Sequence, residues 1–121
     1  MGPQRQHRIL IIDGDERALS VIRTLLVNEG FDVTTACGTE AAISALQSGE
    51  HELVLADDHF ADLTTSCFLK RLVRIRGNAP VIVMESASRL CRVVPYNPLR
   101  VVNKGCSCEI LESVSEILSA R

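Results

Sequence analysis

Four charged side chains stand at the ends of short apolar segments, and their types suit a charged ligand. The segments cover residues 9–12, 53–56, 81–84 and 99–103, and they end on Asp13, Asp57, Glu85 and Lys104. Three carboxylates and one ammonium gathered in one place would form a small charged pocket. The first question is therefore whether the elements of the chain bring these residues together.

An apolar run of about five residues bounded by polar ones is typical of a strand buried on both faces of a parallel sheet. All strands of such a sheet point one way, so their last residues gather along one edge. Ligands of α/β proteins bind at that carboxyl edge. A further strand is predicted over residues 31–36, and the third strand is expected to run from 53 to 57.

Helical patterns alternate with these strands. Asp15 is predicted to be the N-cap of a first helix, which Gly30 ends. Its predicted buried stripe consists of Ala18, Ile22, Leu25 and Leu26. A second helix starts at Gly38 and Thr39 and ends near Gly49, with Ala42, Ile43 and Leu46 inward.

A loop over 59–64 precedes a third helix, whose inward residues are Cys67, Phe68, Leu72 and Ile75. Residues 86–92 allow only about two helical turns, because Pro95 and Pro98 forbid continuation. Ser107 can cap a final helix with the apolar residues Ile110, Leu111, Val114, Ile117 and Leu118. This order predicts an α/β fold: a five-stranded parallel sheet in (βα)₅ order, with helices on both faces and a short or irregular fourth helix.

Length and composition narrow the function classes. The 121 residues fit one domain, over 8–121, behind a polar leader over 1–7. No apolar stretch approaches the roughly 20 residues of a membrane span, and the leader lacks the apolar core of a signal peptide, so we expect a cytoplasmic protein. The net charge of −2 gives no footprint for nucleic acid. We interpret the basic residues Lys70, Arg71, Arg74 and Arg76 as a solvated helix face.

Cysteines and histidines give no metal-binding pattern. The five cysteines are an odd number, which without an export signal favours free thiols in a reducing compartment. Cys106 and Cys108 have the spacing of half a metal site, but no second cysteine or histidine pair has ligand spacing. The histidines His7, His51 and His59 are scattered.

Three segments resemble the receiver domain of two-component response regulators, which has the flavodoxin-like fold of the chemotaxis receiver. They are "LVNEGFDVTTACGTEAA" from Leu26, "ELVLADDHFADL" from Glu52 and "PVIVM" from Pro80. The resemblance covers the chain from Arg8 to the last helix. It implies a signalling module of a phosphorelay, and not an enzyme.

By this resemblance Asp57 is the phospho-acceptor, which takes a phosphoryl group from the phosphohistidine of a kinase or phosphotransfer protein. Asp13 and Asp57 match ligands of Mg²⁺, together with the backbone carbonyl of His59. Lys104 matches the lysine that pairs with the phosphoryl oxygens. A metal ion and positioned donors are what such in-line transfer needs.

Two departures fall inside this pocket. Gly14 stands where the family has a second acid, which should weaken Mg²⁺ binding, although Asp15 or Asp58 could help through water. Glu85 stands where the family has Thr or Ser, and a carboxylate repels a phosphoryl group. Two alternatives stay open: Glu85 forms an ion pair with Lys104, or a one-residue slip places Ser86 in the hydroxyl position.

Other family positions also differ. Gly105 replaces the proline after the lysine, and Val101 replaces the switch aromatic. The proline and glycine of the loop after strand three are Ala61 and Thr65. These positions belong to the surface through which receivers report to partners.

Three hypotheses follow. The first is an atypical receiver that acts as a protein-interaction module without phosphorylation, with a kinase or phosphotransfer protein and a downstream protein as partners, as a monomer or weak homodimer. The second is a working receiver, phosphorylated at Asp57 with weakened Mg²⁺ dependence. The third, a small flavodoxin-like enzyme or nucleotide binder, ranks last because "DGDER" after strand one is not a glycine-rich phosphate loop and no nucleophile pairing is seen.

Overall fold

The structure, a computed structural model, describes residues 6–48, 51–57, 79–85 and 100–119. The predicted loop over 59–64, the third helix and the short fourth helix lie outside the described residues. So does the predicted N-terminal leader, apart from its last two positions.

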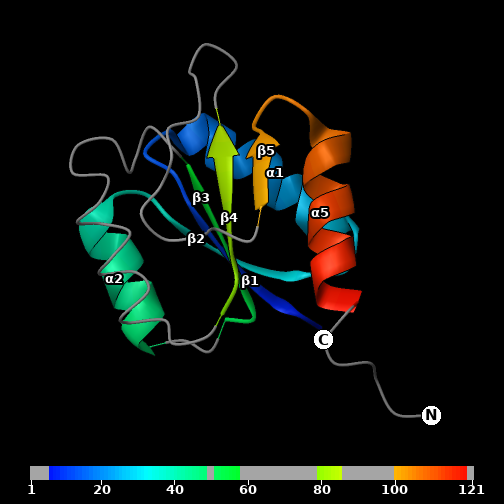
Figure 1. Ribbon diagram of the computed structural model, residues 1–121. Helices are drawn as coiled ribbons and strands as arrows, with labels where there is room; N and C mark the ends of the chain where they lie inside the picture. Colours follow the sequence, from blue (N-terminus) through cyan, green and yellow to red (C-terminus); the bar gives the residue numbers. More distant parts are fainter. Residues whose placement is uncertain (1–5, 49–50, 58–78, 86–99, 120–121) are drawn as a thin grey trace.

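Five parallel strands form one sheet in the order β2-β1-β3-β4-β5 (Figure 1). They are β1 Arg8–Ile12, β2 Asp32–Ala36, β3 Leu53–Asp57, β4 Val81–Glu85 and β5 Arg100–Asn103. The prediction of a five-stranded parallel sheet is therefore confirmed, with strand bounds within one residue of those expected. From β1 the chain adds β2 on one side of the sheet and then adds β3, β4 and β5 on the other side. Ligands of such sheets bind at the carboxyl ends of the two strands where this change of side occurs, which here are β1 and β3.

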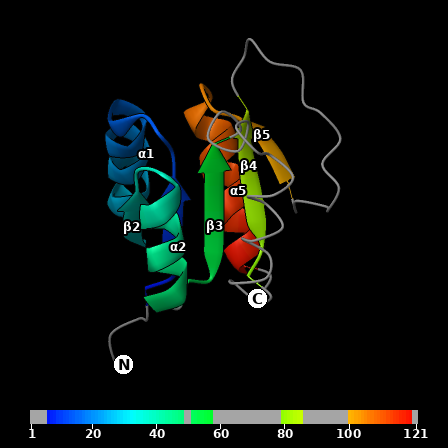
Figure 2. The same ribbon diagram turned by 90° about the vertical axis from the view of Figure 1, so that its left-hand side faces the viewer.

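Helices cover both faces of the sheet, as Figures 1 and 2 show. The helices α1 Glu16–Asn28 and α5 Ser107–Ser119 pack on one face, and α2 Thr39–Ser48 packs on the other. Alternate residues of one strand serve the two faces, because successive side chains point to opposite sides of a sheet. Ile9 and Ile11 join the core under α1 and α5, whereas Leu10 and Ile12 join the core under α2.

Helix α1 differs in phase from the prediction. Its buried residues are Leu19, Ile22 and Leu26, while Ala18 and Leu25 are half-buried. Leu19 carries more apolar area than Ala18, so turning Leu19 inward removes more surface from water. Gly30 has a φ of 93°, which confirms its predicted role in ending this helix.

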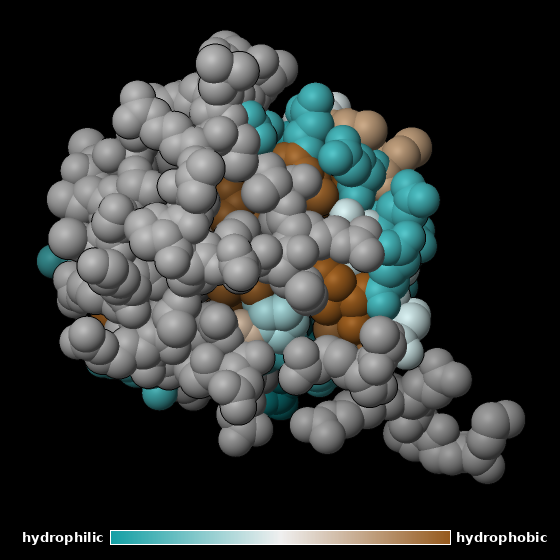
Figure 3. Space-filling model, in the orientation of Figure 1, coloured by the Kyte–Doolittle hydropathy of each residue, from teal (hydrophilic) through white to brown (hydrophobic). Residues whose placement is uncertain are grey.

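Helix α5 begins one residue earlier than a Ser107 cap requires. The carbonyl of Cys106 accepts the first helical hydrogen bond, from Ile110 N at 3.1 Å, so Cys106 stands at the cap and Ser107 is the first helical residue. The predicted apolar residues of α5 lie inward: Ile110, Val114, Ile117 and Leu118 are buried and Leu111 packs against them. The outer face of α5 is hydrophilic, seen as teal at the right of Figure 3. None of the helices in the described ranges is long and apolar enough to cross a membrane.

Candidate functional site

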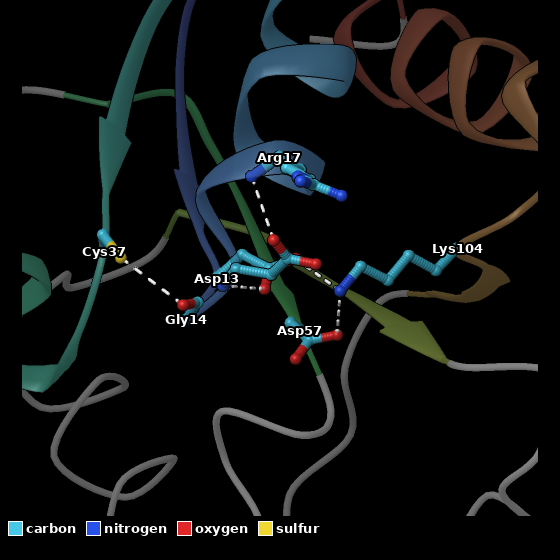
Figure 4. Close-up of polar contacts among 7 residues, drawn as sticks. Asp13, Gly14, Arg17, Cys37, Asp57 and Lys104 are labelled. Carbon is cyan, nitrogen blue, oxygen red and sulfur yellow. Dashed lines mark hydrogen bonds and ion pairs between the residues drawn. The ribbon is translucent and has the colours of Figure 1, made fainter.

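The carboxyl edge of the sheet brings together three of the four charged residues through their side chains (Figure 4). Lys104 Nζ lies 2.6 Å from Asp13 Oδ2 and 2.9 Å from Asp57 Oδ1. Both carboxylates are almost fully buried, at 1% and 2% exposure, and the lysine side chain is 18% exposed. One ammonium therefore bridges two buried carboxylates.

The sheet explains why these two carboxylates are neighbours. Strands β1 and β3 are adjacent and parallel, and Ile12 pairs in register with Ala56. Asp13 and Asp57 directly follow these paired residues, so their side chains emerge side by side. Asp13 and Asp57 are far apart in sequence, and the parallel pairing of β1 with β3 brings them together.

Lys104 reaches this pair from β5, which is separated from β3 by β4. Its backbone N–H donates to the carbonyl of Glu85 at 2.8 Å, and this bond holds the turn after β5 against the end of β4. The long lysine side chain then extends over the end of β4 to the two aspartates. The sequence predicted Lys104 in the pocket but did not predict that it contacts Asp13.

The turn after β1 orients Asp13. Its Oδ1 accepts a hydrogen bond from the backbone N–H of Asp15 at 2.9 Å, while its Oδ2 faces Lys104 as an ion pair. Asp15 in turn caps α1, because its Oδ1 accepts from Arg17 N at 2.9 Å. The predicted N-cap is thus confirmed, and the same turn holds a carboxylate of the pocket. The thiol of Cys37 donates to the carbonyl of Gly14 at 3.5 Å and ties this turn to the end of β2.

The pocket favours the charged form of the lysine. Burial alone would lower the pKa of the Lys104 ammonium, and it is the largest single influence. Hydrogen bonds to Asp13 and Asp57, together with the negative charges of both carboxylates, outweigh burial and raise this pKa above its ordinary value. Lys104 therefore stays a cation across the physiological range.

Glu85 stands at the expected position, but it meets Lys104 through the backbone. Strand β4 ends on Glu85, as the count from Pro80 predicted, and Ser86 lies outside the described residues. Of the alternatives left open, an ion pair between Glu85 and Lys104 is not found among the described residues: their link is the backbone hydrogen bond, and the ammonium pairs with the two aspartates. Two buried carboxylates attract one ammonium more strongly than a single half-buried one does.

The described residues do not fit a magnesium ion while the lysine bridge is in place. Asp13 and Asp57 share their charge with Lys104, and Gly14 supplies no side chain. In the described ranges, no group of three or more histidine, cysteine, aspartate or glutamate side chains could hold a metal. The third predicted ligand, the carbonyl of His59, lies outside those ranges.

The structure describes three of the five cysteines and two of the three histidines. Cys37, Cys106 and Cys108 are free thiols, in agreement with the prediction for these three. His7 pairs with Glu52 near the start of β1, and His51 lies 3.3 Å from the carbonyl of Ala45 in α2. Neither histidine takes part in the aspartate–lysine bridge.

Comparison of sequences finds known proteins that are similar to this chain. The chain is 27% identical over 84 residues to the two-component response regulator ORR21 of Oryza sativa, and 25% identical over 83 residues to the cell cycle transcriptional regulator CtrA of Caulobacter vibrioides. These matches cover 68% and 69% of this chain but only 12% and 36% of the two relatives. No protein-family model matches the chain.

Solved structures show the same fold over almost the whole chain. A CheY-like receiver domain from Methanospirillum hungatei matches with a TM-score of 0.79 at 19% identity, and covers 96% of both chains. A two-component response regulator from Clostridium difficile matches with a TM-score of 0.79 at 24% identity, over 94% of this chain and 97% of that one. The chain therefore has the CheY-like, flavodoxin-like fold, and its sequence is similar to that of two-component response regulators.

Proposed function

We propose that this chain is an atypical receiver that acts in the cytoplasm as a protein-interaction module of a phosphorelay, with Asp57 as its potential phospho-acceptor. The observation that carries the proposal is the Lys104 ammonium lying between Asp13 and Asp57. This internal cation already neutralises part of the charge that a metal ion would otherwise neutralise. The pocket can therefore hold one state without phosphorylation.

Two further residues support an atypical role. Glu85 ends β4, where a phosphoryl group on Asp57 would need a hydroxyl donor rather than a second carboxylate. Gly14 removes one acid from the pocket, and any Mg²⁺ that binds has to displace an ammonium from both remaining carboxylates. We expect Mg²⁺ affinity to be weak for this reason.

The partners follow from the relatives. One solved structure similar to this chain is the response regulator TrrA in complex with the histidine kinase ThkA, with a TM-score of 0.77 and 22% identity. By analogy, a histidine kinase or a phosphotransfer protein is the partner on the input side, and a downstream protein is the partner on the output side. Docking does not require transfer, so a kinase can bind this chain even if Asp57 accepts nothing.

A working receiver is the second candidate. The contact of 2.9 Å between Lys104 Nζ and Asp57 Oδ1 favours it, because a lysine so placed can follow a phosphoryl group once it is attached. In that case a kinase would phosphorylate Asp57 with weakened dependence on Mg²⁺. The two candidates predict opposite results with a phosphoryl analogue.

The test is to add Mg²⁺ with beryllofluoride and to follow backbone amide shifts by NMR, and separately to look for a phospho-adduct by mass after acetyl phosphate. The atypical receiver should show no shift at Asp57 and no adduct at millimolar Mg²⁺. A stoichiometric response that Asp57→Asn abolishes would contradict our proposal and establish the working receiver.

A gain-of-function variant shows what an absent response to beryllofluoride means. Gly14→Asp with Glu85→Thr restores the acid and the hydroxyl of the family, and we expect it to respond to beryllofluoride where the unchanged chain does not. A side chain at Gly14 is tolerated, because a Cβ built there meets no atom within 4 Å and the position has no positive φ. If the double variant folds and stays silent, these two residues are not the cause of the loss.

A further inference from the structure

Two thiols lie at the start of α5, outside the aspartate–lysine pocket. Cys106 precedes the helix and is half-buried, and Cys108 is exposed in its first turn. A single residue, Ser107, separates them, and both are free. This is the one pair of cysteines so close in sequence in the chain, and the proposed function does not use it.

The helix keeps these two thiols apart. Residues two positions apart do not face each other on a helix, and Cys106 at the cap and Cys108 in the first turn have this spacing. A disulfide needs the two Cβ atoms within roughly 3.5–4.5 Å, with a specific dihedral angle. Cys106 and Cys108 can therefore join only if the residue between them leaves the helical conformation. That change breaks the hydrogen bond of 3.1 Å from Ile110 N to the carbonyl of Cys106.

Opening this turn is inexpensive, because it lies at a helix terminus where local unfolding has a low free energy. The hydrogen bond from Ile110 N to the carbonyl of Cys106 closes the helix at this point. The inward residues of α5 begin at Ile110, beyond the segment that must move, so the apolar core of the helix stays in place.

The same segment carries Lys104. The backbone N–H of Cys106 donates to the carbonyl of Asn103 at 3.0 Å, and that of Gly105 donates to Asn103 Oδ1 at 2.9 Å. These two bonds close the turn in which Lys104 stands, between the end of β5 and the start of α5. A rearrangement at Cys106 therefore acts directly on the backbone that positions the Lys104 side chain.

We propose that Cys106 and Cys108 are a redox pair, and that their oxidation opens the first turn of α5 and draws Lys104 away from Asp13 and Asp57. The oxidant is a hydroperoxide. The exposed thiolate of Cys108 attacks the peroxide oxygen and becomes a sulfenic acid, and the leaving oxygen takes up a proton to give water or an alcohol. The thiol of Cys106 then attacks that sulfur, and water leaves. The two thiols lose two electrons and two protons in total, and a reducing dithiol reverses the step by exchange.

This switch acts on the lysine bridge whether or not Asp57 accepts a phosphoryl group, so its failure is distinguishable from that of the proposed function. Release of Lys104 would free both carboxylates for another cation.

The experiment uses the full chain in a background that cannot form other disulfides, with three substitutions: Cys37→Ser, Cys67→Ser and Cys91→Ser. The protein is treated with hydrogen peroxide and then with dithiothreitol. We expect intact mass to show the loss of two hydrogen atoms, peptide mapping to place the bond between Cys106 and Cys108, and amide shifts of Asp13 and Asp57 to change in the oxidised form. Dithiothreitol should restore both the mass and the shifts.

The matched control is Cys108→Ser in the same background, which should keep the shifts of the reduced form under peroxide. Peptide mapping is also done on the oxidised unsubstituted chain. A folding defect caused by the three cysteine substitutions then does not decide the result. If the bond forms in neither protein, the proposal is overturned. A bond that forms without any change at Asp13 and Asp57 overturns the coupling to the pocket and with it the switch.

Discussion

Replacing Lys104 with methionine tests the organisation of the pocket most directly. The substitution keeps the length and the apolar part of the side chain but removes the ammonium from between Asp13 and Asp57. Breaking a buried ion pair by removing one partner costs about 3–5 kcal/mol, because an uncompensated charge stays buried. Here two carboxylates at 1% and 2% exposure are left without that cation, while Lys104 itself keeps 18% exposure. Since the lysine end is partly solvated, we expect the low end of this range, about 3 kcal/mol.

The assay is urea unfolding at neutral pH, with the free energy of unfolding of Lys104→Met compared with that of the unchanged chain. The matched control is Arg8→Met, which breaks the ion pair of 3.9 Å between Arg8 and Asp32 on the same sheet. Both residues of that pair are more than half exposed. An exposed pair contributes about 0–1 kcal/mol, so the control should unfold nearly as the unchanged chain does.

A second measurement separates charge from packing. Without the ammonium, the two carboxylates should accept a divalent cation, so Mg²⁺ should stabilise Lys104→Met, by about 1.4 kcal/mol at ten times the dissociation constant. The unchanged chain should gain much less at the same concentration. If Lys104→Met costs no more than Arg8→Met and gains nothing from Mg²⁺, the bridge does not organise the pocket and our reasoning is refuted.

Two further predictions concern the charge of Lys104 and the start of α1. Because folding raises the pKa of Lys104, its ammonium stabilises the fold fully below the ordinary lysine pKa of 10.5, and this contribution is lost as pH rises through the folded value. The unfolding free energy of the unchanged chain should therefore fall more steeply at alkaline pH than that of Lys104→Met; parallel curves would exclude this residue as the cause. Asp15→Ala removes the N-cap of α1 and should cost about 1 kcal/mol in urea unfolding, whereas Asp15→Asn, which keeps the capping oxygen, should cost a few tenths. Equal losses in both variants would show that charge, not capping, is the contribution of Asp15.

The sequence predicts the sheet well because local patterns decide it. Continuous apolar runs such as the one before Asp57 indicate strands covered on both faces, and Gly30, with a φ of 93°, ends the first helix as expected. The rotation of a helix about its axis is harder to predict. Leu19 rather than Ala18 lies in the core, because the helix turns to whatever angle packs best on the sheet.

Sequence by itself determined which residues stand at the ends of the strands: Asp13, Asp57, Glu85 and Lys104 are all where the pattern predicts. Only the tertiary structure decided which of them touch. The order β2-β1-β3-β4-β5 makes β1 and β3 neighbours, so their aspartates lie side by side and attract the Lys104 ammonium over the end of β4. Glu85 is adjacent to Lys104 through the backbone, yet the ammonium pairs with the two buried carboxylates, because their combined attraction is stronger.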